Sequence, residues 1–331
     1  MHFFKQTNID FIGKRRLWYW VSIIVTVAGI LFAMLRGVEY GIDFAGGTEV
    51  QFKFEKNVPI EDIRSALDNA GFRGAEVKYY GTDESGILIR VPQGAEGAAT
   101  GGTKATQAIV DAVATGIQSN KAELLQEQHI GPKIGAELQQ KALLAVFFTC
   151  IAILIYLAFR FRFVYGIGAV VAIIHDVLVA FAFAVICNGI VPWLNLEMNS
   201  TMLAAFLTIV GFSVNDTVII FDRIREDTKK YKGNDLKTIM NRAINETLPR
   251  TIITSGTVFL TLVVLFIWGG EVLRGFAFTM MVGVITGTYS SIFVASAISY
   301  DWIHRKAKDG DDALAMATGE KKAKQKVAVT A

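Results

Sequence analysis

The sequence predicts a multi-pass, α-helical membrane protein with six transmembrane helices and one small α+β domain after the first helix. Three features of the chain support this fold class. The 331 residues are 52% hydrophobic, with a mean hydropathy of +0.41. Several apolar runs reach the ~20 residues that a helix needs to cross a bilayer. One long polar region separates the first run from the others.

Six apolar runs are the expected transmembrane helices. Trp18, Tyr19 and Trp20 stand at the start of the first run, where aromatic side chains gather at a membrane interface. This run lacks the small-residue cleavage site of a secretory leader, so we expect it to stay in the membrane. The last run is long enough to be tilted. The runs are Leu17–Leu35, Leu143–Phe159, Val164–Cys187, Met202–Phe221, Ile252–Trp268 and Val272–Tyr300.

The distribution of Lys and Arg over the connections predicts the orientation. Basic residues gather in the N-terminal segment, at Arg160–Arg162, in the loop 222–250 and after Asp301, whereas Asn188–Met198 has none. The positive-inside rule then places both termini and this loop in the cytoplasm. The expected units are a cytoplasmic N-terminus with the first helix (1–36), a periplasmic α+β domain (37–140), a five-helix bundle with an amphipathic cytoplasmic loop (141–305) and a disordered cytoplasmic tail (306–331).

The polar region has the pattern of a split βαβ, or ferredoxin-like, sandwich. Thr48–Phe54 alternates apolar and polar residues as a half-buried strand does. Pro59–Ala70 begins with proline and has apolar residues at helical spacing, which predicts a helix. The order βαββαβ is completed by strands over Ala75–Tyr80 and Ile87–Val91, a helix over Thr103–Ile117 and a strand over Ala122–His129. The Gly- and Ala-rich stretch Gln93–Gly102 is expected to be a mobile loop.

No pattern in the chain indicates catalysis. The sequence has no nucleotide-binding loop, no metal-ligand spacing and no catalytic triad. We therefore expect no enzyme activity, no metal, no cofactor and no nucleic-acid partner. Cys150 and Cys187 both lie in apolar runs, where they behave as small hydrophobic residues and not as a disulfide.

Asp216 is the candidate functional residue that stands out most. It lies beside Asn215 inside the run that ends at Phe221, and the charged stretch that begins with Asp222 and Arg223 follows directly. A carboxylate at membrane depth is costly unless it faces a partner or a water-filled path, which favours a functional role. The alternative is a protonated Asp that hydrogen-bonds to a neighbouring helix and only adds stability.

Three more ionisable residues lie in or near the spans. His175 and Asp176 occupy the middle of the third run, and with Asp216 they suggest a proton or ion relay. His175 could equally form only a hydrogen bond across helices. Arg250, directly after Pro249, is a candidate counter-ion for Asp216 if the preceding loop folds back into the bundle. Otherwise it is an interfacial arginine that follows the positive-inside bias.

Two further segments have patterns of helix packing. Small residues recur every four positions in the last run, which predicts a face for close helix contact at Gly283, Gly287, Ser291 and Ala295. Asp235–Leu248 has apolar residues at helical spacing and is expected to form an amphipathic helix on the cytoplasmic surface.

The segment after the first span is rich in glycine. Gly41, Gly46 and Gly47 allow turns that other residues resist, and Asp43 could hydrogen-bond within such a turn. A rigid hinge between the membrane helix and the outer domain is the favoured hypothesis. Direct contact with a substrate is the alternative.

Four motifs together resemble the SecF group of the SecD/SecF family of bacterial protein-export subunits. The resemblance covers nearly the whole chain, up to about Arg305, and its specific part is the block around Asn215–Asp216. The motifs are GIDFAGGT at Gly41–Thr48, the HD pair at His175 and Asp176, GFSVNDTVIIFDRIRE at Gly211–Glu226 and NETLPRT at Asn245–Thr251.

This resemblance implies a fold and a function. The family is similar to one half of a resistance–nodulation–division (RND) transporter. Its members pair with SecD in the bacterial inner membrane and work beside the SecYEG channel, often with YajC. They use the proton motive force, or sodium in some cases, to pull preproteins outward. Asp216 would then be the intramembrane proton site and Arg250 its partner. The competing hypothesis is an RND-type exporter half for lipids or small molecules, which the single small outer domain disfavours.

Overall fold

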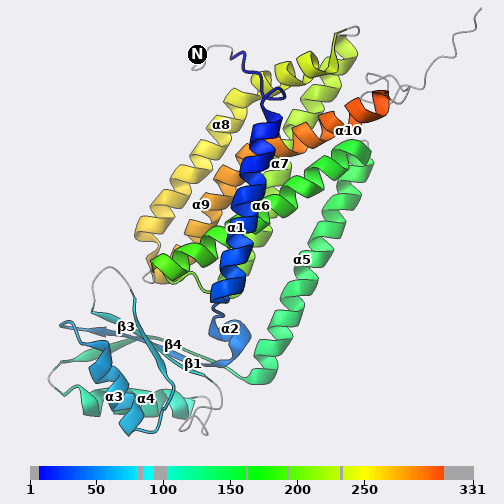
Figure 1. Cartoon of the computed structure of the whole chain (residues 1–331). Helices are drawn as coiled ribbons and strands as arrows, with labels where there is room; N and C mark the ends of the chain where they lie inside the picture. The colour runs from blue at the N-terminus through cyan, green and yellow to red at the C-terminus, as the bar shows by residue number, and fades with distance from the viewer. Residues whose placement is uncertain are drawn as a thin grey trace, which may run out of the picture.

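The computed structural model describes residues 7–80, 85–92, 103–118, 120–161, 163–191, 194–231 and 234–308. Within these residues, six helices are long and apolar enough to cross a membrane, and an α+β domain follows the first of them, as predicted (Figure 1). The α+β domain lies at one end of the helical bundle, which we call the domain face. The start of the first helix and the end of the last one lie at the opposite end, the terminal face. The stretch Gln93–Gly102 and the tail after residue 308 lie outside the described residues.

The membrane helices agree with the six predicted runs, and most of them extend beyond the apolar part. The last span is continuous, with one π-helical turn, η3, between the α-helices α9 and α10. The helices are α1 (Arg15–Arg36), α5 (Pro132–Arg160), α6 (Phe163–Ile190), α7 (Ser200–Lys230), α8 (Leu236–Trp268), α9 (Gly270–Ser290), η3 (Ser291–Ala295) and α10 (Ser296–Lys308).

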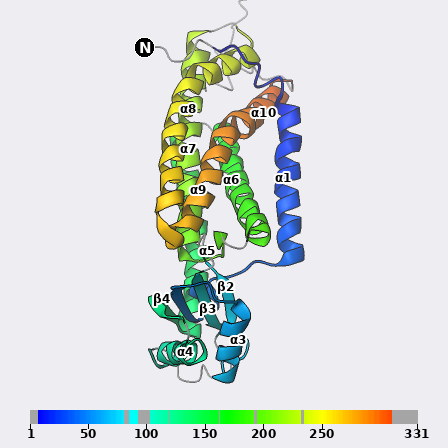
Figure 2. The ribbon, with the colours of Figure 1, turned by 90° about the vertical axis from the view of Figure 1, so that its left-hand side faces the viewer.

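The α+β domain is the predicted split βαβ sandwich. Its strands form an antiparallel sheet in the order β2-β3-β1-β4, and α3 and α4 cover the side of the sheet away from the bundle (Figures 1 and 2). Apolar side chains of alternate strand positions, such as Phe52 and Ile89, fill the core under these helices. The elements are β1 (Gly47–Phe54), α3 (Ile60–Asn69), β2 (Glu76–Tyr79), β3 (Gly86–Pro92), α4 (Thr103–Gly116) and β4 (Ala122–Ile130).

Two predicted boundaries differ from the structure. The domain ends at β4, and α5 already begins at Pro132 and not near residue 140, because a proline is tolerated at the first position of a helix and the chain enters the span from there. The loop expected over 222–250 is mostly helical, since α7 continues to Lys230 and α8 begins at Leu236.

The amphipathic segment 235–248 is helical as predicted, and its apolar face is buried against neighbouring helices. It forms the first turns of α8, and its apolar residues Leu236, Met240 and Ile244 pack in one cluster with Phe221 of α7. An apolar helical face can be buried by a neighbouring helix or by lipid. The amphipathic pattern of the sequence therefore does not show which of these surfaces covers it. Pro249 lies inside α8, and the helix bends towards its start in Figures 1 and 2.

The small-residue face of the last span packs against α6 and α7. A Cβ added at Gly283 would overlap Ile209 of α7, and one at Gly287 would lie 3.3 Å from Ser213 Cβ. On the other side, a Cβ added at Gly168 of α6 would lie 2.7 Å from the carbonyl oxygen of Ala295. These close approaches bring the polar side chains of the three helices together in the middle of the bundle.

Candidate functional site

Asp176 is held by side chains from two neighbouring helices. It is fully buried on α6, and its Oδ2 accepts hydrogen bonds from Ser213 Oγ of α7 (2.5 Å) and Ser290 Oγ of α9 (2.7 Å). Its Oδ1 lies 3.0 Å from Nδ1 of the adjacent His175. Gly287 makes room for this arrangement, since an added Cβ would stand 3.7 Å from Asp176 Oδ2. Both carboxylate oxygens are therefore engaged.

Asp216 is equally buried but has fewer partners. Its Oδ2 accepts a hydrogen bond from Ser255 Oγ of α8 at 3.2 Å, and Thr288 of α9 donates to the same Ser255 Oγ at 2.8 Å. The other oxygen, Oδ1, is buried and has no hydrogen-bond partner among the described residues. Asp216 and Asp176 thus belong to one polar zone, to which α6, α7, α8 and α9 all contribute.

A polar chain continues from His175 towards α1. The ring of Tyr289 lies 6.0 Å from that of His175. Its hydroxyl donates to the carbonyl oxygen of Trp18 at 3.0 Å and lies 2.7 Å from Ser22 Oγ. His175 therefore has contacts on both sides, with Asp176 in the bundle and with an aromatic ring that borders α1.

The structure does not bring Asn215 and Arg250 to Asp216. Asn215 is exposed on the outer face of α7, because successive residues of an α-helix point about 100° apart. Arg250 is also exposed, and within the described part of the chain no ion pair joins it to Asp216. It lines a cleft of about 860 Å³ at the terminal face, together with Asp222, Arg223 and Glu246. Among the described residues the predicted ion pair of Asp216 with Arg250 is not formed in this conformation, and the coupling role of these residues stays a prediction.

The charged stretch after Asp216 joins three helices at the terminal face. Asp222 pairs with Arg160 at the end of α5 (2.5 Å). Arg223 binds Glu246 of α8 and also Glu226, one turn further along α7 (2.8 Å). These contacts explain why charges cluster directly after an apolar run.

Two family models match the chain: the C-terminal domain of SecD/SecF protein export membrane proteins over residues 109–305, and the SecD/SecF GG motif over residues 34–58. The chain belongs to the SecD/SecF family of protein-export membrane proteins. The first match contains Asp176, Asp216 and their hydroxyl partners. The second contains the glycine-rich segment after α1.

Individual relatives agree with the family assignment. The chain is 38% identical to protein translocase subunit SecF of Calditerrivibrio nitroreducens over 89% of its length, and 40% identical to that of Rhodothermus marinus over 90%, each alignment covering 94% of the relative. Its fold is similar to the crystal structure of SecDF, a translocon-associated membrane protein from Thermus thermophilus, with a TM-score of 0.79 and 33% identity. That match covers 90% of this chain and 39% of the SecDF chain, so this chain spans less than half of it. These relatives support the export-subunit hypothesis and not the lipid or small-molecule exporter.

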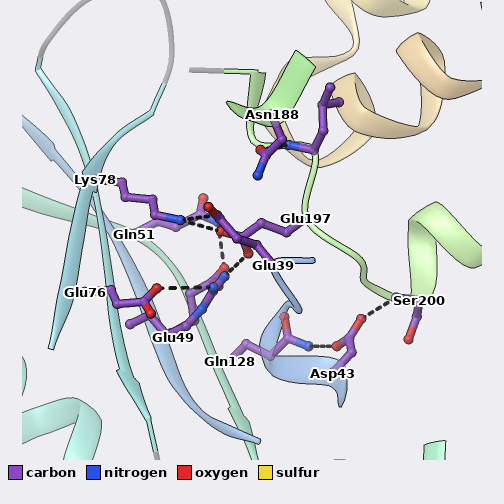
Figure 3. Close-up of polar contacts among 12 residues, drawn as sticks. Glu39, Asp43, Glu49, Gln51, Glu76, Lys78, Gln128, Asn188, Glu197 and Ser200 are labelled. Carbon is purple, nitrogen blue, oxygen red and sulfur yellow. Dashed lines mark hydrogen bonds and ion pairs between the residues drawn. The ribbon is translucent and has the colours of Figure 1, made fainter. Parts of the chain in front are cut away.

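The GG motif of the SecD/SecF family forms a docked joint between the domain and the bundle. Asp43 lies in the short helix α2 (Ile42–Ala45). Its Oδ2 accepts from the backbone N–H of Ser200, the first residue of α7 (2.8 Å), and its Oδ1 accepts from Gln128 of β4 (2.9 Å) (Figure 3). The Gly41 N–H donates to the carbonyl of Met198 in the loop before α7 (2.8 Å).

The second glycine of the GG pair starts the sheet. Gly47 has φ +135°, and a Cβ there would stand 2.6 Å from the carbonyl oxygen of Val91. Gly46 also has a positive φ, +73°, which favours glycine. These contacts describe a joint with fixed geometry, in keeping with the hinge hypothesis for Gly41, Gly46 and Gly47.

A cluster of charges at the same joint was missed by the sequence analysis. The junction cluster consists of Glu39, Glu49, Lys78, Arg90 and Glu197. Lys78 Nζ lies 2.8 Å from Glu39 and 3.0 Å from Glu197 (Figure 3). Arg90 pairs with Glu49 (2.8 Å) and with Glu197, which is only 2% exposed. The cluster therefore ties the sheet to the loop between α6 and α7.

The pKa values of the acid Glu39 and of the bases Lys78 and Arg90 shift in the directions expected for ion pairs. Burial alone would raise the pKa of Glu39, but the hydrogen bond and charge of Lys78 lower it below its usual value. Burial would likewise lower the pKa of Lys78 and of Arg90, and the nearby Glu197 and other carboxylates raise both instead. One signal was available in the sequence: Arg90 is the single charge in an apolar strand, and Glu197 the single charge in its loop.

Proposed function

We propose that the chain is a SecF-type accessory subunit of the Sec translocase that uses the proton motive force to drive late steps of protein export across the bacterial inner membrane. The family and the names of its relatives support this role. The similar SecDF chain is more than twice as long, and we infer that a SecD-type part works together with this one. The SecYEG channel, YajC and the translocating preprotein are the further partners, and the basic terminal face is the cytoplasmic side.

The outer face of α7 supports a helical partner. Ala204, Thr208, Gly211 and Asn215 are all exposed and recur at intervals of four, three and four residues, so they form one stripe along the helix. A Cβ added at Gly211 would meet nothing within 4 Å. Small residues of this kind line contacts between membrane helices, and a polar Asn can hydrogen-bond across such a contact. This stripe is the proposed docking surface for SecD, which gives Asn215 a role away from Asp216.

One observation supports the proposed role of Asp216 in coupling to the proton motive force. The carboxyl is fully buried, yet one of its oxygens has no partner within the described residues and no cation stands at ion-pair distance. An ionised carboxylate in such surroundings is costly, whereas a protonated one loses its charge and keeps the bond to Ser255. Asp216 therefore holds a proton in this conformation and releases it when a cation or water reaches it.

Arg250 is the proposed cation. It precedes Ser255, the partner of Asp216, by five residues on α8, which is about 7.5 Å along the helix axis. Five residues also turn the helix by about 140°, so the guanidinium would reach the carboxylate by extension of the side chain together with a rotation of α8. Two unit charges 4 Å apart interact by about 4 kcal/mol at an effective dielectric of 20. The motive force supplies about 2.3 kcal/mol per charge and 100 mV. The two are comparable, so one proton can drive the pair apart once per cycle.

Asp216→Asn tests the coupling role. Asn keeps the shape and accepts the bond from Ser255 but cannot ionise. In inverted membrane vesicles that contain SecD and SecYEG, we expect the variant to assemble normally and its export rate to fall to the rate without a proton motive force. Asp235→Asn makes the same chemical change at an exposed acid of the terminal face, and should export like wild type. Full stimulation by the motive force in Asp216→Asn would contradict the proposal.

A double variant tests the role of Arg250. We expect Arg250→Lys to be partly active and Arg250→Ala to lose motive-force-dependent export. In Arg250→Ala with Asp216→Asn the loss should be no larger than in either single variant, because one step is removed twice. Losses that add would mean that the two residues act independently and that Arg250 is only an interfacial anchor.

A further inference from the structure

A groove of about 760 Å³ lies between α1, α6 and the η3–α10 segment, towards the terminal face. Apolar side chains line most of its length, and polar and charged ones gather at the end near the terminal face. The groove meets the candidate functional site only at His175. Neither buried aspartate lines it.

Close helix contacts set the shape of this groove. Towards the domain face α1 and α6 touch, because Gly29 packs directly against Ala182. Towards the terminal face the two helices diverge, and α10 leans towards the start of α1 (Figures 1 and 2). Arg15 of α1 pairs there with Asp301 of α10 at 2.8 Å. The chain itself holds the groove open and does not fill it.

The apolar walls are accessible along the membrane-spanning part. Ile23 and Val27 of α1 are 51% and 47% exposed, and Val171 and Ile174 of α6 are 40% and 49% exposed. On α1 the lining extends from Tyr19 to Val27, a rise of about 12 Å along the helix. An elongated apolar channel of this kind, open to the bilayer, fits an acyl chain.

Charged side chains border the end of the groove near the terminal face. Asp301 is already engaged by Arg15 and by the hydroxyl of Tyr19 (3.2 Å). Arg305 has no ion-pair partner among the described residues, nor does Lys306, whose Nζ lies over the Trp302 ring at 5.9 Å. The indole Nε1 of Trp302 is buried and, within the described part of the chain, has no hydrogen-bond partner. Two cations therefore border the same end of the groove, where a headgroup would stand.

We propose that this groove binds an anionic phospholipid. Its phosphate is held by Arg305 and Lys306, and one acyl chain lies along Ile23 and Val171. Basic pockets between membrane helices suit acidic headgroups, and each Lys or Arg near the surface strengthens the binding of an anionic lipid by about fivefold. Two such residues give a preference of about 30-fold over a zwitterionic lipid.

The bound lipid also affects the neighbouring site. His175 lines the groove on one side and bonds Asp176 on the other. An acyl chain against His175 keeps water of the bilayer surface away from the Asp176 hydrogen bonds. The lipid is then a packing element beside the polar zone, and its loss would open that zone from the α1 side.

Quenching of Trp302 fluorescence tests the proposal with the full chain. Trp302 is kept as the single tryptophan by replacing Trp18, Trp20, Trp193 and Trp268 with Phe. The protein is placed in phosphatidylcholine vesicles that contain increasing fractions of either phosphatidylglycerol or phosphatidylcholine with brominated acyl chains, which quench on contact. With a preference of about 30-fold, we expect half-maximal quenching at about 3% brominated phosphatidylglycerol and at about 50% brominated phosphatidylcholine.

Two sets of variants test where on the protein the lipid binds. Arg305→Ala with Lys306→Ala should remove the preference for phosphatidylglycerol, whereas Lys229→Ala with Lys230→Ala removes two exposed cations of the terminal face outside the groove and should keep it. Val171→Phe fills the apolar channel and should reduce quenching by both lipids. All of these positions are exposed, so the variants should fold.

Several outcomes would overturn the proposal. Equal quenching by the two lipids would mean that no acidic headgroup is selected. A preference that survives loss of Arg305 and Lys306, or quenching unchanged by Val171→Phe, would place the lipid outside the groove. Quenching that disappears when a SecD-type chain is bound would assign the groove to a partner helix.

Discussion

The molecule buries acidic side chains in two places, and their partners differ in kind. At the junction cluster, Glu197 meets the cations of Arg90 and Lys78. In the bundle, Asp176 and Asp216 meet the hydroxyls of serine side chains, and His175 is the one ionisable neighbour at hydrogen-bond distance among the described residues. Both regions connect segments far apart in the chain. They do so with different chemistry.

The difference separates a fixed link from a group able to change its charge. Loss of the Glu197 charge would take one ion-pair partner from both Arg90 and Lys78, which would keep Glu49 and Glu39, so this link depends on all of its charges. A hydroxyl donates to a carboxylate and can also accept from a protonated carboxyl, so it serves both forms. Within the bundle, Asp176 has both oxygens bonded, whereas one oxygen of Asp216 is free of partners in the described residues. Under the proposed coupling role, Asp216 would be the acid whose proton leaves with the least rearrangement.

The largest expected effect is at the junction. Arg90→Met leaves Glu197 buried with only Lys78, and we expect the link between domain and bundle to weaken by about 3–5 kcal/mol. Limited proteolysis and thermal unfolding of the purified chain should show a loosened domain. Arg64→Met is the matched control, since Arg64 is exposed on α3. Adding Glu197→Gln to Arg90→Met should restore part of the loss, and an unchanged protection pattern in Arg90→Met would erase the distinction drawn between the two regions.

A smaller effect should separate the two bundle acids. Asp176→Ala leaves the hydroxyls of Ser213 and Ser290 without their acceptor, which costs about 1–3 kcal/mol. Asp216→Asn retains an acceptor for Ser255 and should change stability by less than about 1 kcal/mol. Unfolding in mixed micelles with increasing denaturing detergent measures both. If Asp216→Asn proved the more destabilising change, Asp216 would be the structural acid and the assignment of roles would be reversed.

The smallest effect concerns pH at the junction. The lowered pKa of Glu39 adds stability that is present above its ordinary value, about 4.3, and is lost as the pH falls through the folded-state pKa. The raised pKa of Lys78 adds stability that is present below about 10.4 and is lost as the pH rises through the folded-state pKa. The protection factors of β2 and β3, which are exchange rates corrected for the intrinsic effect of pH, should therefore be highest between about pH 5 and 9.

The acid-side change should be about 1 kcal/mol or less, because Glu39 is half exposed. Glu39→Gln should make the protection factors of β2 and β3 less dependent on pH in the acid range. An acid response of the same size in Glu39→Gln would point to other carboxylates, with Glu49 the next candidate in the cluster.

The sequence by itself determined the six spans, the βαββαβ order and the burial of Asp216 and Asp176. These properties follow from local patterns: the length of an apolar run, a period of two or 3.6 residues, and the cost of a charge within such a run. Each can be evaluated from neighbours in the chain. The same holds for the glycines of the GG motif, whose need for a positive φ is a property of the backbone.

Only the tertiary structure decided which side chains meet. Arg90 and Glu197 are 107 positions apart, and Ser290 and Asp176 are 114 apart. Asn215 and Asp216 point about 100° apart on α7, and the packing of the other helices decides that Asp216 and not Asn215 is buried. The amphipathic start of α8 packs against a neighbouring helix, whereas its sequence suggested contact with the membrane surface. An apolar helix face indicates that it will be buried, but it does not indicate which surface buries it.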